Sequence, residues 1–465
     1  MRDARADGAR RVTAEWLATH EGERLERLNR FLAIPSVSTK AEHGADVARC
    51  AEWLAGELRR IGLAAEVHPT EGHPVVLGEW RGAGTAARTV LIYGHYDVQP
   101  PEPLELWRSP PFVGTTREGR LYARGAADDK GQVWIHLMAL EACLAARGAL
   151  PVNVVLLLEG EEEVGSPSLP AYIEAHQERL SCDYIVISDT VMHAPGVPNI
   201  LASMRGLAYF ELSARSAATD LHSGQYGGIV ANAAAGLAQL LAGLGGPDGA
   251  VAIAGFYDDV RPPSPERRRA LAALTFDAER LASELGVDAL RGEPGYTPLE
   301  RLWLRPTCEV NGIVAGYTGE GAKTVIPSTA LAKLSFRLVP DQTPERVEQR
   351  LREHVRRTQL PGVTFELRPL HGGLPWSRDG STPDVGAARR ALASAFDHAA
   401  VLGGTGGTIP IVPELARWFD AEILLIGFGL PGENAHAPNE WIDLDTVRRG
   451  ARAIVSLYDE LAAIP

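Results

Sequence analysis

The sequence predicts an α/β protein whose mostly parallel sheet is covered by helices, with a smaller α+β sandwich inserted into it. Three observations predict this fold class. In the first half of the 465-residue chain, short continuous apolar segments alternate with longer helical patterns, which is typical of a parallel sheet buried on both faces. The middle of the chain instead combines alternating strands with two helices, which indicates a separate α+β unit. The length itself predicts two or three domains.

The elements of the parallel sheet are expected in a regular order. Residues 45–62 have apolar positions at helical spacing and end at Gly62, a suitable C-cap. A second helical pattern runs from about Lys130 to Ala146, and His136 lies on its apolar face as an expected core histidine. Four apolar segments are expected to be strands: Thr89–Tyr93, Asn153–Leu158, Tyr184–Ile187 and Ile423–Phe428.

The elements of the inserted unit follow from Leu207 onward. In chain order we expect a strand at 207–214, helices at about 229–243 and 264–293, a strand at 330–338, a helix from about 343 and a strand at 363–367. The change of pattern falls near residues 205 and 372. The predicted domains are therefore 1–204 with 373–465, and an inserted domain of 205–372.

Composition excludes several classes of protein. The net charge of −13 argues against a nucleic-acid partner and against binding to an anionic membrane surface. The longest apolar segments fall far short of the roughly 18 residues that a membrane-spanning helix needs, and the charged N-terminus lacks a signal-peptide pattern. Four scattered cysteines without a CxxC pair disfavour a disulfide scaffold and a thiolate zinc site. A soluble cytoplasmic protein without nucleic-acid or membrane partners is expected.

Acidic and histidine residues follow the predicted strands where those strands end. They are His95 and Asp97, Glu161–Glu163, Asp189 and His436, with Asp128 and Asp129 just before the helix at 130. Open α/β sheets bind ligands beyond the carboxyl ends of their strands. Carboxylates mixed with imidazoles suit Zn²⁺, Mn²⁺ or Co²⁺, and one bridging carboxylate would allow two metals to activate a water. The alternative is that these polar groups merely satisfy one another.

Eight motifs occur in an order that resembles a known family. They are GHYDVQP (94–100), LYARGAADDKG (121–131), EGEEEVGS (159–166), ISDT (187–190), TDLHSG (219–224), GAKTVIP (321–327), FRLVP (336–340) and HAPNEW (436–441). From about residue 30 to 460 the chain resembles the dinuclear-zinc peptidase family of carnosine-type and cytosolic non-specific dipeptidases, aminoacylases, carboxypeptidase G and succinyl-diaminopimelate desuccinylases. The resemblance is closest to the dipeptidase branch.

The resemblance implies a role for each residue of the predicted metal site. His95 and Asp189 would bind one metal, Glu163 and His436 the other, and Asp128 would bridge them. Glu162 would be the general base, with a role swap to Glu161 or Glu163 as the alternative. Asp97 would orient the His95 ring, and Asp128–Asp129 would be the family's cis peptide. The cofactors would be two divalent ions per subunit, Zn²⁺ first, with Mn²⁺ or Co²⁺ as alternatives.

The resemblance also makes the inserted domain a lid that mediates homodimer formation. His222 would reach the partner subunit's site to polarise the scissile carbonyl; its alternative is a helix-capping or lid-packing histidine. Arg337 would bind the substrate's carboxylate, or else pair with a lid carboxylate. Thr324, His371 and Thr408 would be supporting substrate contacts.

The expected function is metal-dependent hydrolysis of the amide bond of a dipeptide, or of a similar small substrate with a free carboxylate. One alternative is an N-acyl-amino-acid amidohydrolase, which would differ on the amine side of the pocket around Thr405–Thr408. There this chain has Thr405 where the dipeptidase branch often has Glu. A non-catalytic binding protein is disfavoured, because Glu162 and all five expected ligands are present.

Overall fold

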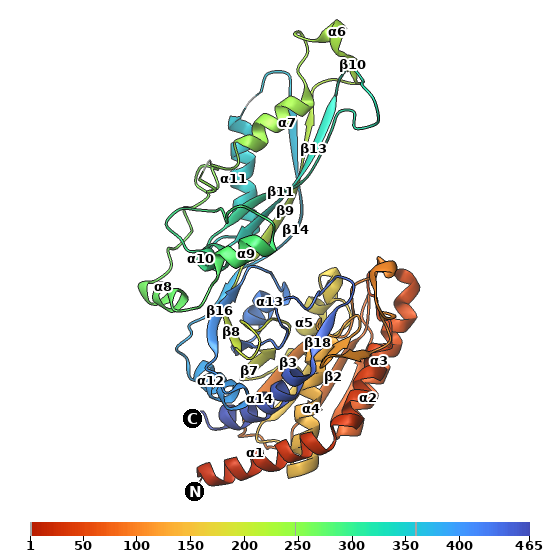
Figure 1. Cartoon of the computed structure of the whole chain (residues 1–465), viewed down its shortest axis with the longest axis vertical. Coiled ribbons are helices and arrows are strands. Elements are labelled where there is room, and N and C mark those ends of the chain that lie inside the picture. Colours follow the sequence, from red (N-terminus) through yellow and green to blue (C-terminus); the bar gives the residue numbers. More distant parts are fainter. Residues whose placement is uncertain (1, 247, 359) are drawn as a thin grey trace. The chain divides into compact units, whose positions relative to one another are not determined.

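The computed structural model describes residues 2–246, 248–358 and 360–465, which form two compact units (Figure 1). The first unit comprises the chain up to Ala202 together with Asp379–Gly403 and Glu414–Pro465. The second comprises Ser203–Arg378 and Gly404–Pro413. The sequence-based boundaries placed residues 404–413 in the predicted domain of 1–204 with 373–465. In the structure this segment belongs to the second unit, with the inserted residues.

The first unit is built on a sheet whose central strands are parallel. The order is β1-β2-β6-β3-β7-β17-β8, in which β6, β3, β7 and β17 run parallel and the outer pairings are antiparallel. Every residue of β3 and β6 is buried, so helices cover both faces, as the apolar strand pattern predicts. The strands are β1 (Ala64–His68), β2 (Val75–Trp80), β3 (Thr89–His95), β6 (Asn153–Glu159), β7 (Tyr184–Ile187), β8 (Asn199–Met204) and β17 (Glu422–Leu425).

Helices and a small second sheet complete the first unit. The small sheet has the order β18-β5-β4 and is antiparallel. Its strands are β4 (Thr115–Arg117), β5 (Arg120–Tyr122) and β18 (Trp441–Asp443). The α-helices are α1 (Arg2–Thr19), α2 (Glu21–Leu32), α3 (Gly44–Ile61), α4 (Lys130–Arg147), α5 (Leu169–Leu180), α12 (Pro383–Phe396), α14 (Leu444–Ala462) and α13 (Ile411–Trp418), which begins in the second unit and continues in the first. Short 3-10 turns are η1 (Ala41–His43), η2 (Leu104–Leu106) and η3 (Glu162–Val164). The last of these turns carries two of the predicted site residues.

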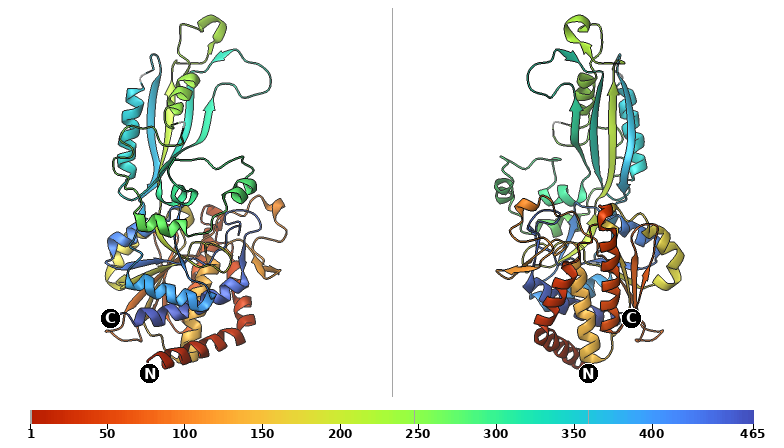
Figure 2. Two further views of the ribbon diagram at one scale, coloured as in Figure 1. Left: turned by 60° about the vertical axis from the view of Figure 1, so that its left-hand side comes forward. Right: turned by 90° about the vertical axis from the view of Figure 1, so that its right-hand side faces the viewer.

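The second unit is a four-stranded antiparallel sheet with helices α7 and α11 packed on it (Figure 2). The sheet order is β11-β13-β9-β14, and β10 pairs with β12 in a separate two-stranded ribbon. The elements are β9 (Gly206–Arg215), β10 (Leu221–His222), α6 (Ser223–Tyr226), α7 (Ala233–Ala242), α8 (Pro265–Ala272), α9 (Ala278–Glu284), α10 (Pro298–Leu304), β11 (Thr307–Ala315), β12 (Val325–Ile326), β13 (Thr329–Leu338), α11 (Pro344–Arg357), β14 (Thr364–Gly373), β15 (Trp376–Ser377) and β16 (Val401–Thr405), the last of which spans both units.

Two expected elements differ from the sequence prediction, each for a local reason. The helical stretch at 264–293 is divided into α8 and α9, because Asp277 caps a new helix by accepting a hydrogen bond from the Arg280 N–H at 2.8 Å. The strand expected at 423–428 ends at Leu425, because its parallel partner β7 ends at Ile187, which is paired with Leu425. Among the described residues, none of the helices is both long and apolar enough to span a membrane.

Candidate metal centre

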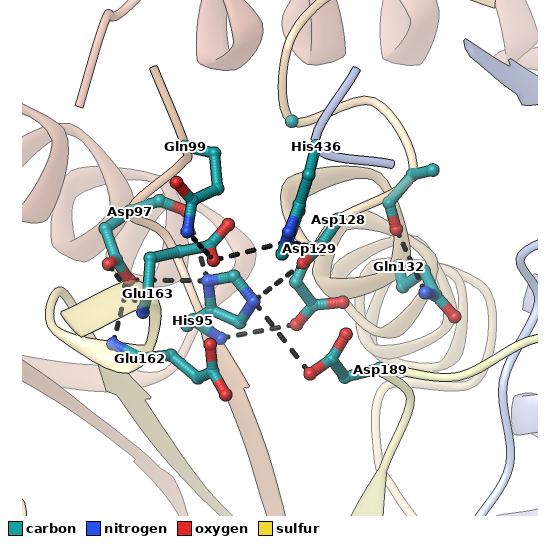
Figure 3. Close-up of polar contacts among 12 residues, drawn as sticks. His95, Asp97, Gln99, Asp128, Asp129, Gln132, Glu162, Glu163, Asp189 and His436 are labelled. Carbon is teal, nitrogen blue, oxygen red and sulfur yellow. Dashed lines mark hydrogen bonds and ion pairs between the residues drawn. The ribbon is translucent and has the colours of Figure 1, made fainter. Parts of the chain in front are cut away.

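The predicted site residues of the first unit lie beyond the carboxyl ends of neighbouring parallel strands (Figure 3). His95 is the last residue of β3 and is fully buried. Asp189 lies two residues after β7, and Glu163 lies in the turn η3 that follows β6. Because β6, β3 and β7 are adjacent and parallel, their ends deliver these side chains to one edge of the sheet.

One group of potential ligands surrounds the His95 ring. Its Nε2 lies 3.0 Å from Asp128 Oδ1 and 4.0 Å from Asp189 Oδ2. Asp128 comes from the loop before α4, and its peptide bond to Asp129 is cis, as the sequence resemblance implies. Asp129 does not join this group; its Oδ2 accepts a hydrogen bond from the His95 main-chain N–H at 3.3 Å.

A second group shares Asp128 and lies on its other carboxylate oxygen. His436 Nε2 is 2.9 Å from Asp128 Oδ2 and 3.3 Å from Glu163 Oε2. One histidine, one shared carboxylate and one further carboxylate thus meet on each side of Asp128, and in both groups the potential ligand atoms lie within 4.8 Å of one another. The structure therefore brings together all five predicted ligands in the predicted pairing.

Asp97 contacts residues of both ligand groups. His95 Nδ1 lies 3.1 Å from the main-chain carbonyl oxygen of Asp97 and 3.3 Å from its carboxylate Oδ1. Its carboxylate also accepts hydrogen bonds from the main-chain N–H groups of Glu162 at 3.3 Å and Glu163 at 3.1 Å. The first contact supports the predicted role of orienting the His95 ring. The second contacts were not predicted, and they hold the turn that carries Glu163.

The electrostatics of the cluster favour a cation. Burial raises the pKa of Asp128, but hydrogen bonds from the rings of His436 and His95 outweigh burial and hold it well below the usual range. Burial and the charge of Asp128 raise the pKa of Asp189 well above its usual value and that of Glu163 to about 8. Three carboxylates cannot all be charged in this buried space unless positive charge compensates them.

The donor set fits divalent metal ions. Glu163 Oε1 is buried and has no hydrogen-bond partner among the described residues, although such oxygens are normally satisfied. Mixed imidazole and carboxylate donors, without thiolates, are typical of hydrolytic rather than structural metal sites. The arrangement can hold two cations, one on each side of the Asp128 carboxylate.

The three consecutive glutamates have different surroundings. Glu163 belongs to the second group, whereas Glu161 faces away from it and accepts main-chain hydrogen bonds from His73 at 3.0 Å and Ser168 at 3.2 Å. Glu162 is directed toward the space near His95 and Asp189 (Figure 3). Burial raises the pKa of Glu162.

The predicted substrate contacts lie in the second unit. Arg337, on β13, donates to Thr408 Oγ1 at 3.1 Å, and Thr408 in turn donates to the Arg205 carbonyl at 2.6 Å. In the described part of the chain Arg337 has no carboxylate partner, so the alternative of a lid ion pair is absent there. Burial lowers the pKa of Arg337.

The other three predicted contacts are on exposed elements of this unit. His222 caps the four-residue helix α6, its Nδ1 accepting from the Gly224 N–H at 3.0 Å. Thr324 accepts a hydrogen bond at its carbonyl from the Ser223 N–H at 3.1 Å, and His371 stacks on Tyr209 with ring centroids 5.0 Å apart. The capping alternative for His222 is thus present in this chain, and capping through Nδ1 leaves Nε2 available.

One residue that the sequence analysis missed contacts the centre directly. Gln99 donates from its side-chain amide to Glu163 Oε2 at 2.8 Å. It lies in the motif GHYDVQP, four residues after His95, so its position in that motif was the available signal. The contact fixes Glu163 Oε2, whereas Oε1 has no hydrogen-bond partner in the described part of the chain.

Comparisons with known proteins agree with this geometry. The family model described as peptidase family M20/M25/M40 matches residues 91–460. The chain is 32% identical to the Cys-Gly metallodipeptidase of Schizosaccharomyces pombe, covering 95% of this chain and 96% of that protein. It is 30% identical to the human Beta-Ala-His dipeptidase, covering 97% and 92%. A solved family M20 metallo-carboxypeptidase from Sulfolobus solfataricus superimposes with a TM-score of 0.84 at 34% identity, covering 95% and 100%.

Proposed function

The chain belongs to peptidase family M20/M25/M40, and we propose that its activity, the metal-dependent hydrolysis of dipeptides, is carried out at the cluster around Asp128. The activity follows the relatives, which are named Cys-Gly, Beta-Ala-His and cysteinylglycine-S-conjugate dipeptidases. The observation that carries the assignment of the site is the pair of potential ligand groups that share the Asp128 carboxylate.

We assign one divalent cation to His95, Asp128 and Asp189, and a second to Asp128, Glu163 and His436. Zn²⁺ is the proposed metal, with Mn²⁺ and Co²⁺ as alternatives of similar ligand preference. The three carboxylates supply three negative charges against four positive charges, so the loaded centre stays electrophilic. When bound, the cations supply Lewis acidity toward the scissile carbonyl and make a water molecule more acidic.

Glu162 is the proposed general base. Its carboxylate lies next to the cluster without belonging to either ligand group. Its raised pKa suits a group that takes a proton from the attacking water and returns it to the leaving amine. Asp97 holds the main-chain N–H of Glu162, which keeps the base in place during this transfer.

The second unit carries the proposed substrate contacts. We propose that Arg337 binds the free carboxylate of the substrate through its planar guanidinium, since its partner in the described chain is the neutral Thr408. Thr408, Thr324 and His371 are proposed supporting contacts. His222, from a second copy of the chain in a homodimer, is proposed to polarise the carbonyl. A cytoplasmic location remains a prediction.

The test is the substitution Glu162→Gln in protein loaded with Zn²⁺ or Mn²⁺. We expect metal content to be retained and kcat on dipeptides to fall about 10²–10⁴-fold, because the proton acceptor is lost. Glu161→Gln is the matched control, because among the described residues this neighbouring carboxylate joins neither ligand group and accepts main-chain N–H groups. Its amide faces one of those donors, which costs stability, but kcat should stay within about tenfold.

Near-normal turnover by Glu162→Gln would overturn the general-base assignment. The same assay separates the alternative reaction, because dipeptides with a free amine and N-acyl amino acids are offered side by side. Cleavage of the acylated set alone would assign the chain to the amidohydrolases.

A further inference from the structure

Glu440 is a buried carboxylate beside the metal centre that neither ligand group uses. It lies in the motif HAPNEW, four residues after His436 and directly before β18, and it is 0% exposed. A charged group so completely removed from water must be compensated by hydrogen bonds or an opposite charge. Its partners therefore show what it does.

Four donors converge on the two oxygens of Glu440. Oε2 accepts from the Arg124 guanidinium at 2.6 Å and from the Gly125 N–H at 2.9 Å. Oε1 accepts from the Ala127 N–H at 2.8 Å and from the Asp128 N–H at 3.1 Å. The carboxylate is thus fully engaged by one short segment, residues 124–128.

That segment ends at the shared carboxylate of the centre. The last of the four donors is the main chain of Asp128 itself, whose side chain lies 3.0 Å from His95 and 2.9 Å from His436. The turn is held from the other side as well, because Arg124 is 1% exposed and also donates to the Pro100 carbonyl at 3.1 Å. A displacement of this turn would move Asp128 relative to both histidines.

Glu440 also holds the segment that carries His436. Its own carbonyl accepts from the Ala123 N–H at 3.1 Å, and β18 begins at the next residue. One residue therefore joins the C-terminal loop of the second ligand group to the loop of the bridging aspartate, across 312 positions of sequence between Asp128 and Glu440.

We propose that Glu440 is the positioning residue of the bridging aspartate: its carboxylate fixes the turn 124–128 so that Asp128 serves both cations at once. This inference rests on the proposed role of Asp128. In this proposal Glu440 contacts neither metal nor substrate, because its oxygens accept hydrogen bonds from peptide N–H groups and from Arg124. Residues that hold metal ligands in this way typically contribute 10–100-fold to metal affinity or activity.

The experiment uses the full chain loaded with two equivalents of Mn²⁺, whose electron paramagnetic resonance spectrum shows whether the two ions are spin-coupled through a shared ligand. In Glu440→Gln one oxygen is replaced by an amide donor, which meets N–H donors on either side. We expect the dissociation constant of at least one Mn²⁺ to rise about 10–100-fold, the coupled spectrum to weaken, and kcat to fall with little change in KM.

Two further variants separate positioning from folding. Glu433→Gln is the matched control, because Glu433 is also buried in the C-terminal segment, at 4% exposure, but makes no hydrogen bond to residues 124–128 among the described contacts. It should keep the coupled spectrum. Glu440→Asp keeps the charge opposite Arg124 but is one methylene shorter. We expect it to fold even if Glu440→Gln does not, and still to weaken the coupling.

The outcomes are distinguishable from those of the proposed function. If the unmodified chain shows no coupled Mn²⁺ pair, the shared-carboxylate centre is wrong and this inference is overturned with it. If the unmodified chain is coupled, and folded Glu440→Gln or Glu440→Asp keeps the same coupling and affinity, the positioning role alone is overturned. Loss of coupling in the Glu440 variants but not in Glu433→Gln supports it.

Discussion

The two ligand groups of the metal centre share one aspartate but are built differently. The His95 ring is 0% exposed and ends a buried central strand, whereas the His436 ring is 54% exposed and lies on a loop. The first group is built around the end of the buried strand β3. The second is completed by a segment from the far end of the chain. The comparison suggests that one cation position is part of the fold and the other depends on docking of that segment.

The backbone around His436 is strained, so the second ligand group also depends on contacts that hold this loop in place. His436 has φ +62°, and Asn434 and Asn439 nearby are also left-handed, at +57° and +62°. Left-handed backbone costs a non-glycine residue about 1–3 kcal/mol, although asparagine tolerates it better than histidine. The contacts of Asn439 with Arg108 N and Leu106 O, both at 2.8 Å, and those of Glu440 oppose this strain.

The largest expected effect comes from removing what the two groups share. Asp128→Asn replaces one carboxylate oxygen by an amide nitrogen that cannot bind a cation. We expect both cations to bind more weakly and turnover to fall by more than about 100-fold, which exceeds the typical effect of a supporting residue. Metal titration by calorimetry checks this. Tight binding of two ions by Asp128→Asn would show that the groups are independent.

Alanine substitutions of the two histidines should distinguish the two ligand groups by their effects on metal stoichiometry and on stability. His436→Ala should reduce metal stoichiometry from two to one and change the free energy of unfolding of the metal-free chain by less than about 1 kcal/mol, because the ring is exposed. His95→Ala should destabilise that chain by about 3–5 kcal/mol, since it removes a fully buried ring together with its contacts to buried Asp97 and partly buried Asp128. Equal destabilisation in urea unfolding would remove the distinction.

A smaller effect is expected from Asp97, which contacts residues of both ligand groups. Asp97→Asn keeps its size but replaces one acceptor oxygen by a donor, which weakens either its contact with His95 or those with the Glu162 and Glu163 N–H groups. We expect kcat/KM to fall about 10–100-fold. If kcat/KM fell only because KM rose, with kcat unchanged, Asp97 would be assigned to substrate binding and the orienting role would be wrong.

The smallest expected effect concerns His136, a buried residue that supports the ligand group of His95 and Asp189. His136 is 1% exposed, lies 2.8 Å from Ser188 Oγ next to Asp189, and burial lowers its pKa to about 3. The unfolded chain binds this proton near pH 6.5, so stability is full above that pH and is lost as the pH falls toward 3. By pH 5 the loss is roughly 2 kcal/mol.

The measurement compares urea unfolding of the unmodified chain and of His136→Gln at pH 7 and pH 5. The variant lacks this titration, so its stability should fall less between the two pH values, by roughly 2 kcal/mol. Other titrating groups are common to both chains and cancel in the comparison. Parallel losses would show that His136 is charged in the folded state.

Local patterns were sufficient for much of the fold. The strands containing Tyr93, Leu157 and Ile187 were predictable because continuous apolar segments must be buried on both faces. The break at Asp277 was missed, because a capping residue within a charged helical stretch looks like any other surface aspartate until the chain turns there.

The sequence by itself was sufficient to predict the five side chains that the structure brings together and the edge of the sheet they occupy, since parallel strands deliver their following residues to one edge. Only the tertiary structure decided how those residues are held. Glu440 and Asp128 are 312 positions apart, and the peptide N–H groups that join them have no sequence signature, because every residue except proline carries one. The contrast between buried His95 and exposed His436 likewise arises from packing between distant segments.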